Sequence, residues 1–417
     1  MKQTANRHCP VCDGDAGEVL HTQRFVLLEL HPLSSGYNVV SCRACGFVYA
    51  DTAASQQQFD RFYSALSKYQ DPATATGSGE SPEDASRLLE TASRIASVLP
   101  SLDARILDIG CANGGLLEAL RRLGYRYLQG LDPAPGCVRT AQSRGLKAAE
   151  GSILYLPTMD SPFDCVILCH VLEHVQDLKT ALFNVRGLLH NDSLLYAEVP
   201  DAARYSDFLY APFQDFNTEH INHFSRSSLE HLFSRCGYHS TGGGEILLPL
   251  PESRFYPAVY GFFKLERHES SVDRHLKDEG LAASIRHYVH GSARLMEEVD
   301  LHLQCHLSPD GPFILWGTGQ LASKLLSDTV LARLRLLACV DSNPVYHGHT
   351  LAGAPILPPA QLKSSSVPIV IASLLHAQSI ARRIRELGVT NPLVFLRPEV
   401  TVADEMTAGV ANWEDAS

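Results

Sequence analysis

Two cysteine pairs near the start of the chain have the spacing of a metal site. They are Cys9-Pro-Val-Cys12 and Cys42-Arg-Ala-Cys45. Zinc favours a tetrahedron of thiolates, and each CxxC turn presents two sulfurs on one side. The pattern predicts a structural Zn²⁺ held by all four cysteines, with no coordination position left for catalysis. Free thiols or a redox pair are the alternative, although nothing around these pairs resembles the thioredoxin-like helix start of a redox CxxC.

A glycine-bearing loop follows the cysteines. Asp108-Ile-Gly-Cys-Ala-Asn-Gly114 lies between an expected strand and an expected helix, and Gly110 and Gly114 would let the backbone approach a ligand closely. Asp132 ends the next expected strand, where a carboxylate can accept both hydroxyls of a ribose. Ala112 fills the middle position of a GxGxxG motif and leaves less room for a pyrophosphate. The loop therefore favours a nucleoside cofactor over NAD.

Histidines follow two further expected strands. His170 and His174 come after the fourth strand, and Glu219-His220 lies in the segment after the fifth. A histidine beside a carboxylate at a strand-end crevice is a plausible acid or base. His223 would be one turn further if that segment is helical. Hydrogen-bonded loop histidines and a buried polar network are the alternatives.

Alternating patterns divide the chain into four expected segments. We expect a zinc-binding arm at 1–75, a parallel-sheet domain at 81–245, a helical connector at 250–308 and a second Rossmann-like domain at 309–405. The arm carries a β-like run at 25–28 and a helix at 56–70, and 71–80 is read as a linker. The tail from Glu405 is expected to fray. The first domain's expected strands are 105–109, 128–131, 147–149, 165–168 and 194–198, and Ser81-Pro82 starts its first helix.

The second βα series begins with Trp316-Gly-Thr-Gly319, and Asp341 ends its next expected strand. The third glycine of a dinucleotide fingerprint is missing, so NAD binding is disfavoured. Amides at 317–320 could receive a phosphate instead. A structural or dimerising role is the alternative. The remaining expected strands are 312–316, 336–340, 369–372 and 393–395.

Composition excludes several function classes. The hydrophobic content of 45% is that of an ordinary globular chain, and the formal charge of −11 argues against nucleic-acid or anionic-membrane partners. No apolar run reaches the ~18 residues of a membrane span. The first eight residues lack a signal-peptide core, and the scattered single cysteines suit a reducing compartment. We therefore expect a cytoplasmic protein with a small-molecule substrate; monomer and homodimer stay open.

The motifs resemble those of the class I S-adenosylmethionine-dependent methyltransferases over about residues 85–245. That resemblance implies S-adenosylmethionine as cofactor and an α/β fold with a Rossmann-like methyltransferase sheet. It implies that the loop with Asp108, Gly110, Asn113 and Gly114 lies against the methionine and ribose, and that Asp132 binds the ribose. Ser152 stands where the family usually has an acid at the adenine, and His170 is a further candidate for cofactor contact. The residues that carry the likeness are Leu107-Asp-Ile-Gly-Cys-Ala-Asn-Gly114, Asp132, Leu156-Pro157, Phe163-Asp164, Val171-Leu-Glu-His-Val175 and Gly237-Tyr238.

The whole arrangement resembles the zinc-containing sugar C-methyltransferases, which act on nucleotide-linked ketosugars. That resemblance implies catalytic roles for Glu219, His220 and His174, with a proton removed by His220 and a developing enolate stabilised by polar groups. It implies that the second Rossmann-like domain holds the nucleotide of the substrate. The expected substrate contacts are Tyr63 (with Tyr69 as second choice), His223, and Asn217, which stands where that family has Tyr.

Three other functions stay open. An O- or N-methyltransferase would use Glu219 and His220 to deprotonate a hydroxyl or amine. A non-catalytic binding protein would keep the zinc arm and cofactor pocket, and a redox enzyme would need NAD(H) in the second domain.

Overall fold

The computed structural model describes residues 6–66, 78–99, 101–266 and 277–397. The chain divides into two compact units. The first comprises Met1–Gln23, Leu30–Leu209 and Asp215–His290, and the second comprises Arg24–Glu29, Tyr210–Gln214 and Gly291–Ser417. The alternative Tyr69, most of the expected linker and the tail from Glu405 lie outside the described residues.

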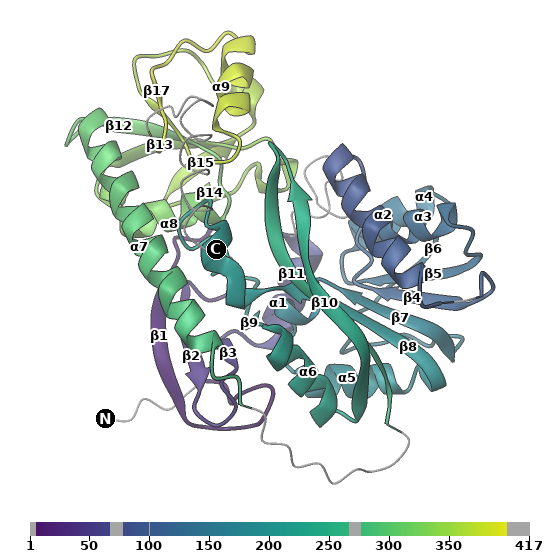
Figure 1. Cartoon of the computed structure of the whole chain (residues 1–417). Helices are drawn as coiled ribbons and strands as arrows, with labels where there is room; N and C mark the ends of the chain where they lie inside the picture. Colours follow the sequence, from purple (N-terminus) through teal and green to yellow (C-terminus); the bar gives the residue numbers. More distant parts are fainter. Residues whose placement is uncertain (1–5, 67–77, 100, 267–276, 398–417) are drawn as a thin grey trace, which may run out of the picture. The chain divides into compact units, whose positions relative to one another are not determined.

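A seven-stranded sheet forms the centre of the first unit (Figure 1), in the order β10-β11-β8-β7-β4-β5-β6. All five predicted strands are confirmed. The parallel strands are β4 (Arg105–Ile109), β5 (Tyr127–Asp132), β6 (Lys147–Glu150), β7 (Phe163–Cys169) and β8 (Leu189–Pro200). Because β4, β5, β6, β7 and β8 run parallel, their carboxyl ends meet at one edge, where ligands of such sheets bind.

The hairpin of β10 (Tyr238–Leu250) and β11 (Arg254–Leu265) corrects the expected connector. The sequence predicted a helical connector over 250–308, but among the described residues of that range the helix is α7 (Leu281–His306), and 254–265 form a strand. β11 pairs antiparallel with β8 on one side and β10 on the other. The runs 257–259 and 261–263 are buried in that position, as in a strand covered on both faces. The sheet therefore continues past the predicted boundary at 245.

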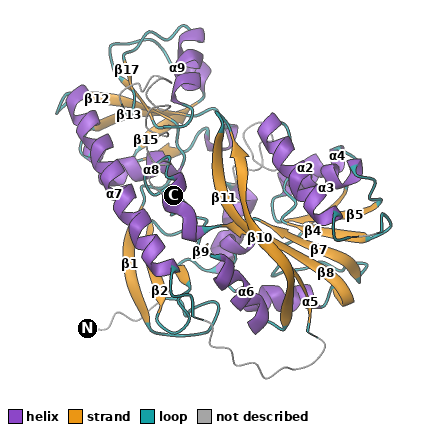
Figure 2. Ribbon diagram, viewed as in Figure 1, coloured by secondary structure: helices purple, strands orange, loops and turns teal. Residues whose placement is uncertain are grey.

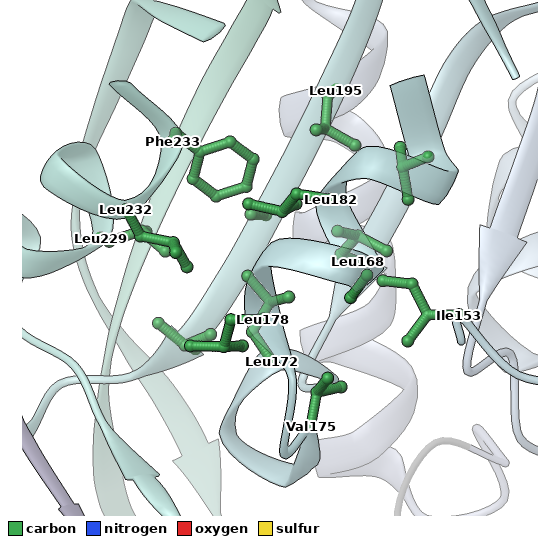
Figure 3. Packing of buried hydrophobic residues seen from close by; sticks show 14 of the residues in the cluster. Ile153, Leu168, Leu172, Val175, Leu178, Leu182, Leu195, Leu229, Leu232 and Phe233 are labelled. Carbon is green, nitrogen blue, oxygen red and sulfur yellow. The ribbon is translucent and has the colours of Figure 1, made fainter. Parts of the chain in front are cut away.

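Alternate residues of the strands face opposite helical layers, as the period of a strand requires. Leu107 and Leu168 pack with α5 (Leu178–Arg186) and α6 (Arg226–Arg235). Figure 3 shows Leu168 beside Leu178 and Leu182 of α5. Ile106 and Ile167 pack instead with α2 (Pro82–Ala96) and α3 (Gly115–Arg122), and α4 (Pro135–Ser143) covers the sheet nearby. Figure 2 shows helices on both faces of the sheet.

The predicted start of α2 is confirmed, because the Ser81 hydroxyl accepts a hydrogen bond from the Asp84 amide.

The N-terminal arm shares a sheet with the segment that follows β8. The order is β1 (Gly17–Arg24), β2 (Gly36–Cys42), β3 (Val48–Asp51) and β9 (Asn222–His223). β3 and β9 are antiparallel, and Val48 is opposite His223. The expected helix is found as α1 (Gln56–Ala65), whereas the expected strand at 25–28 is not formed. The arm thus belongs to the same compact unit as the large sheet.

The Arg7 guanidinium links this arm to two loops of the large sheet. It donates to the carbonyl oxygens of Val175 (3.4 Å), Gln176 (2.6 Å) and Ile221 (3.2 Å), and to the Asn222 side chain (2.9 Å). Arg7 is buried, and burial lowers its pKa to about 10. A rigid fork with five donors suits this set of acceptors better than a lysine would.

The second unit contains the second predicted sheet, in the order β14-β15-β13-β12-β16-β17. β12 pairs parallel with β13 and β16, as a Rossmann-like sheet requires. None of the helices in the described residues is long and apolar enough to cross a membrane. The elements are β12 (Pro312–Trp316), α8 (Gln320–Asp328), β13 (Arg335–Val340), β14 (Thr350–Leu351), β15 (Ala354–Leu357), β16 (Ile369–Ile371), α9 (Ala377–Glu386) and β17 (Leu393–Val394).

Replacement of Arg7 by lysine should destabilise the first unit. The ammonium group cannot reach all four acceptors, so buried carbonyls lose partners at a cost of about 2 kcal/mol or more. The midpoint of thermal unfolding should fall by several degrees in calorimetry. Arg61→Lys, on the exposed face of α1, is the control. Equal midpoints for the two variants would contradict the anchoring role of Arg7.

Candidate active site

The glycine loop has the backbone that the sequence predicts. Gly110 and Gly114 have φ angles of 80° and 82°, which favour glycine. A Cβ atom at Gly110 would lie 2.6 Å from Val171 Cγ2, and one at Gly114 would lie 2.5 Å from Leu146 Cδ1. Asn113, between them, is fully buried. The loop therefore packs too closely for side chains at either glycine.

Two buried aspartates flank this loop at the carboxyl ends of β4 and β5. Asp132 accepts hydrogen bonds from the amides of Ala112 and Ala134, both at 2.8 Å, and burial raises its pKa to about 6. Asp108 Oδ1 is buried and has no hydrogen-bond partner in the described part of the chain. Burial, and then the charge of Asp132, raise the pKa of Asp108 to about 8. A cationic ligand group would offset both penalties.

Ser152 lies just after β6. Its hydroxyl accepts a hydrogen bond from the Tyr155 amide at 3.2 Å, and the two residues also form an isolated β-bridge. The hydroxyl therefore closes a turn of its own.

His170 lies between two buried carboxylates. Its Nδ1 is 3.1 Å from Glu173 Oε1, and its Nε2 is 3.3 Å from Glu198 Oε1. Burial alone would lower the pKa of His170, but hydrogen bonds to Glu173 and Glu198 outweigh it and raise the pKa to about 9. His170 was predicted to contact the cofactor. In the structure, both of its ring nitrogens contact protein carboxylates instead.

The structure brings together three predicted acceptor-site residues, Tyr63, His174 and His220. The imidazoles of His174 and His220 meet edge to face, with centroids 4.9 Å apart. The Tyr63 ring is 6.0 Å from that of His174, also edge to face. His174 is the last residue of the short 3-10 turn (Leu172–His174) that follows β7. β7 pairs with β4, and β4 leads into the glycine loop. The cluster therefore belongs to the same edge of the sheet as that loop.

Asn217 and Glu219 shape this cluster mainly through the backbone. Asn217 Oδ1 accepts from the amides of Glu219 and His220, both at 2.8 Å, and so closes the turn before His220. The Glu219 backbone oxygen is 3.1 Å from His174 Nδ1. The orientation of His220 by the Glu219 carboxylate stays a prediction.

His223 lies apart from the cluster. The segment is strand β9, not the helix on which its predicted position depended. Its ring is fully buried and packs against Phe216 and Tyr205, with centroids 4.9 Å and 6.1 Å away. Burial, and then the charge of Arg7, lower its pKa to about 3. This placement favours a packing role over the predicted substrate contact.

Two residues near the cluster were not singled out from the sequence. Glu173 Oε1 is 3.9 Å from His174 Nε2, and its position directly before His174 was the available signal. His31 packs against Phe62 at 5.4 Å and has a lowered pKa, through burial first, while the charge of Glu219 acts to raise it. No sequence signal marks His31, because only the folding of the arm brings it here.

The four cysteine sulfurs gather within 4.8 Å of one another. Cys9 and Cys45 Sγ are 3.6 Å apart, and Cys12 and Cys42 Sγ are 3.5 Å apart. Four sulfurs at ~2.3 Å from a tetrahedral Zn²⁺ would be about 3.8 Å apart, so the cluster fits that ion closely. Gly46 follows Cys45 and has a φ angle of 78°. A Cβ atom at Gly46 would lie 2.1 Å from the Asp278 backbone oxygen, so no side chain fits there.

The glycine turn of the second unit is hydrogen-bonded to a carboxylate at the end of the next strand. The Asp341 carboxylate accepts from the Thr318 amide (2.8 Å), the Thr318 hydroxyl (2.6 Å) and the Asn343 amide (2.8 Å). Asp132 accepts two backbone amides in the same way, so the bond from the Thr318 hydroxyl is the difference between the two carboxylates. That NAD binding is disfavoured stays a prediction.

A family comparison matches the segment with the glycine loop and the histidines. Residues 79–241 match the model of a methyltransferase domain. Residues 79–241 form a class I S-adenosylmethionine-dependent methyltransferase domain. The match ends before β11, which completes the same sheet.

Curated relatives share parts of this methyltransferase domain. A ubiquinone biosynthesis O-methyltransferase from Azorhizobium caulinodans is 40% identical over 88 residues, which are 20% of this chain and 34% of that protein. The human mitochondrial ubiquinone biosynthesis O-methyltransferase is 37% identical over 93 residues, which are 20% of this chain and 25% of that protein. The chain thus spans about a third or less of the length of these two relatives.

Solved structures give a weaker likeness. A Burkholderia thailandensis 1,6-didemethyltoxoflavin-N1-methyltransferase, with bound S-adenosylhomocysteine, is 18% identical with a TM-score of 0.34. The match covers 43% of this chain and 78% of that one. A likeness of this size carries no functional argument.

Asp108→Asn should change how stability depends on pH in the cofactor-free protein. The folded pKa of about 8 lies above the unfolded value of ~3.9, so the folded state keeps a proton that the unfolded state loses. Stability should therefore fall as pH rises through this window, and the asparagine variant should lose that part of the fall. Thermal unfolding at about pH 5 and pH 8 measures it. Asp103→Asn changes an exposed aspartate and should show the same pH dependence as wild type. If Asp108→Asn also shows the wild-type pH dependence, Asp108 is not the titrating group.

Proposed function

We propose that the protein is an S-adenosylmethionine-dependent C-methyltransferase acting on an activated, nucleotide-linked ketosugar. The observation that carries the proposal is the pair of imidazoles, His174 and His220, beside Tyr63 and next to the loop of a methyltransferase domain. A base and a proton donor on adjacent rings suit removal of a proton next to a carbonyl. The choice of a ketosugar rests on the resemblance of the motifs.

The residues at the strand ends fit the proposed cofactor. When bound, S-adenosylmethionine would supply an electrophilic methyl group at this edge. The unsatisfied Asp108 carboxylate oxygen suits a cationic part of the methionine, and Asp132 suits the ribose hydroxyls. Gly110, Asn113 and Gly114 would allow close approach of the backbone, and Ser152 and His170 remain proposed neighbours.

In the proposed reaction, the chain's own groups handle a proton and an oxygen. His220 removes the proton from the carbon next to the ketone, and His174 donates a hydrogen bond to the enolate oxygen that develops. Asn217 keeps its amide N–H groups as donors, because its oxygen is engaged in the turn. Tyr63 forms one wall for the sugar, and the groups are fixed before the reaction, which reduces reorganisation.

Further proposals concern zinc, partners and location. The four-cysteine cluster would hold one structural Zn²⁺, and the second unit would hold the nucleotide of the substrate. None of the eleven cysteines, all of which lie in the described residues, forms a disulfide, which agrees with the proposed cytoplasmic location. The negative net charge favours a small-molecule partner over a nucleic acid.

O-methylation of a small molecule is the second candidate. The curated relatives that match this domain are named O-methyltransferases. The same two imidazoles could deprotonate a hydroxyl group instead of a carbon.

Methyl transfer from isotope-labelled S-adenosylmethionine to a panel of nucleotide-linked 4-ketosugars tests the proposal. We expect a new carbon-linked methyl group, located by NMR, on at least one member. In deuterated buffer without methyl donor, the adjacent proton should exchange, and His220→Ala should slow that exchange by about 100-fold or more. A methyl group on oxygen would support the second candidate and reject carbon methylation.

Elemental analysis tests the zinc proposal. The purified protein should contain one zinc ion per chain, and Cys42→Ser should lose most of it and unfold at lower temperature. Cys305→Ser, at an exposed thiol of α7, should keep the metal. Zinc content that is the same in both variants would remove the assignment.

A further inference from the structure

Three side chains in the histidine cluster have the composition of a metal centre. They are Glu173, His174 and His220, and one possible ligand atom from each lies within 4.8 Å of the others. Two imidazoles and a carboxylate bind divalent ions such as Zn²⁺, Co²⁺ and Fe²⁺, and they leave coordination positions open. The proposed reaction uses the two histidines to handle a proton, but it gives Glu173 no role and assigns no metal here.

The backbone orients one nitrogen of His174 as a ligand. Its Nδ1 is 3.1 Å from the Glu219 carbonyl oxygen, which can only accept, so Nδ1 carries the proton. In the neutral ring the lone pair is then on Nε2, which lies 3.9 Å from Glu173 Oε1. Metal-binding histidines almost always donate their second N–H to a carbonyl or carboxylate in this way. His174 therefore has the tautomer that an ion at Nε2 requires.

Glu173 presents an oxygen that a hydrogen bond already holds in place. Its Oε1 is 3.1 Å from His170 Nδ1, and the other nitrogen of His170 is 3.3 Å from Glu198 Oε1. Because a carboxylate oxygen has two lone pairs, the bond from His170 leaves one lone pair of Oε1 for an ion. Hydrogen bonds of this kind to a ligating carboxylate are common around metal ions.

The second oxygen of Glu173 is independent evidence that the carboxylate favours a cation. Glu173 is 1% exposed, and its Oε2 is buried with no hydrogen-bond partner among the residues that the structure describes. A buried carboxylate that is only partly paired is costly, and a bound cation would reduce that cost.

The distances suit an ion after a small closure of the group. Nitrogen and oxygen ligands lie about 2.1 Å from Zn²⁺, so two ligands of a tetrahedral ion are about 3.4 Å apart. The separation of His174 Nε2 and Glu173 Oε1, 3.9 Å, exceeds this by about 0.5 Å. The rings of His174 and His220 have centroids 4.9 Å apart, and both are partly exposed. Their side-chain torsions can therefore adjust, and an ion can reach them from solvent.

We propose that Glu173, His174 and His220 bind one divalent transition-metal ion such as Zn²⁺, and that this ion inhibits methyl transfer. The site differs from the four-cysteine cluster because it contains no thiolate. A bound ion occupies the lone pair with which His220 would accept the proton of the substrate, and it holds His174 through Nε2. Neither imidazole can then exchange a proton with the substrate. The inhibition rests on the proposed function, whereas binding of the ion does not require it.

Cobalt titration of the full chain tests the site, after the cysteine cluster has been filled with zinc. Co²⁺ held by nitrogen and oxygen atoms shows visible d–d absorption, whereas thiolate ligands add charge-transfer bands in the near ultraviolet. We expect one Co²⁺ per chain to bind with d–d bands and without thiolate bands. If no cobalt binds, or if thiolate bands grow with the bound cobalt, the proposal is overturned.

Variants locate the bound cobalt. His220→Asn and Glu173→Gln should each weaken its binding by about 100-fold or more, because loss of even an outer partner of a metal ligand costs about 10- to 100-fold. If Glu173→Gln does not fold, His220→Asn decides alone, since its side chain is partly exposed. Unchanged affinity in His220→Asn would overturn the proposal.

The matched control is a second pair of histidines. His302 and His306 stack one turn apart on α7, with ring centroids 4.1 Å apart, and two histidines at this spacing on a helix are a known metal-binding arrangement. His306→Asn should bind cobalt as the wild type does. Cobalt that is lost in His306→Asn but kept in His220→Asn would assign the ion to α7 and reject the proposed site.

Methyl transfer provides a separate readout. Zn²⁺ at concentrations that fill the site should lower kcat by about 100-fold, which is the contribution expected of a general base. A weak chelator that leaves the cysteine-bound zinc in place should restore the activity. Full activity with the site filled would overturn the inhibitory role. If no ketosugar is methylated but cobalt binds as expected, the proposed function fails and the metal site stands.

Discussion

The buried guanidinium of Arg7 is the contact on which the candidate site most depends. It binds carbonyls of Val175 and Gln176, just after His174, and of Ile221, just after His220. One side chain of the arm therefore fixes the two loops that carry the histidine pair. The pairing of β3 with β9 acts in the same direction, because it joins the arm to the chain segment that follows His220. The two loops also bond to each other directly, because the Asn222 side chain donates to the carbonyls of Leu172 and Val175, both at 2.7 Å. The arm therefore adds to a restraint that the loops already share.

The large sheet supplies the other half of the arrangement. Its parallel strands end at one edge, so Asp108, Asp132, His170 and Glu198 gather there although they are far apart in sequence. Acids predominate in that group, and burial makes each of them costly to ionise. His170 and Arg94 neutralise Glu198, whereas Asp108 keeps an oxygen without a partner. The charges at this edge therefore favour a cationic ligand. The sulfonium group of S-adenosylmethionine is such a cation.

Local sequence patterns predicted the strands and the glycine loop well, since apolar periodicity and positive-φ glycines are local properties. β11 was missed because Pro257 and Gly261 interrupt a run that only pairing on both sides makes a strand. The placement of His223 was missed for a similar reason: β9 exists only through its pairing with β3. The motifs singled out Tyr63, His174 and His220, whose rings lie close together in the structure, and the roles of these residues stay predictions. The contacts of His31 depend on tertiary packing, which no single segment of sequence encodes, whereas Glu173 meets His170 and His174 within one short segment.

A crystal structure with bound S-adenosylhomocysteine would test the central claim most directly. The claim is that the arm, the loop after β7 and the segment before β9 present one acceptor site to the cofactor edge of the sheet. We expect the cofactor sulfur to lie between the Gly110 loop and the two imidazoles. An acceptor carbon could then reach the methyl group within about 3.5 Å while its proton contacts His220. Cofactor bound elsewhere, or a sulfur screened from both imidazoles by protein, would contradict the account.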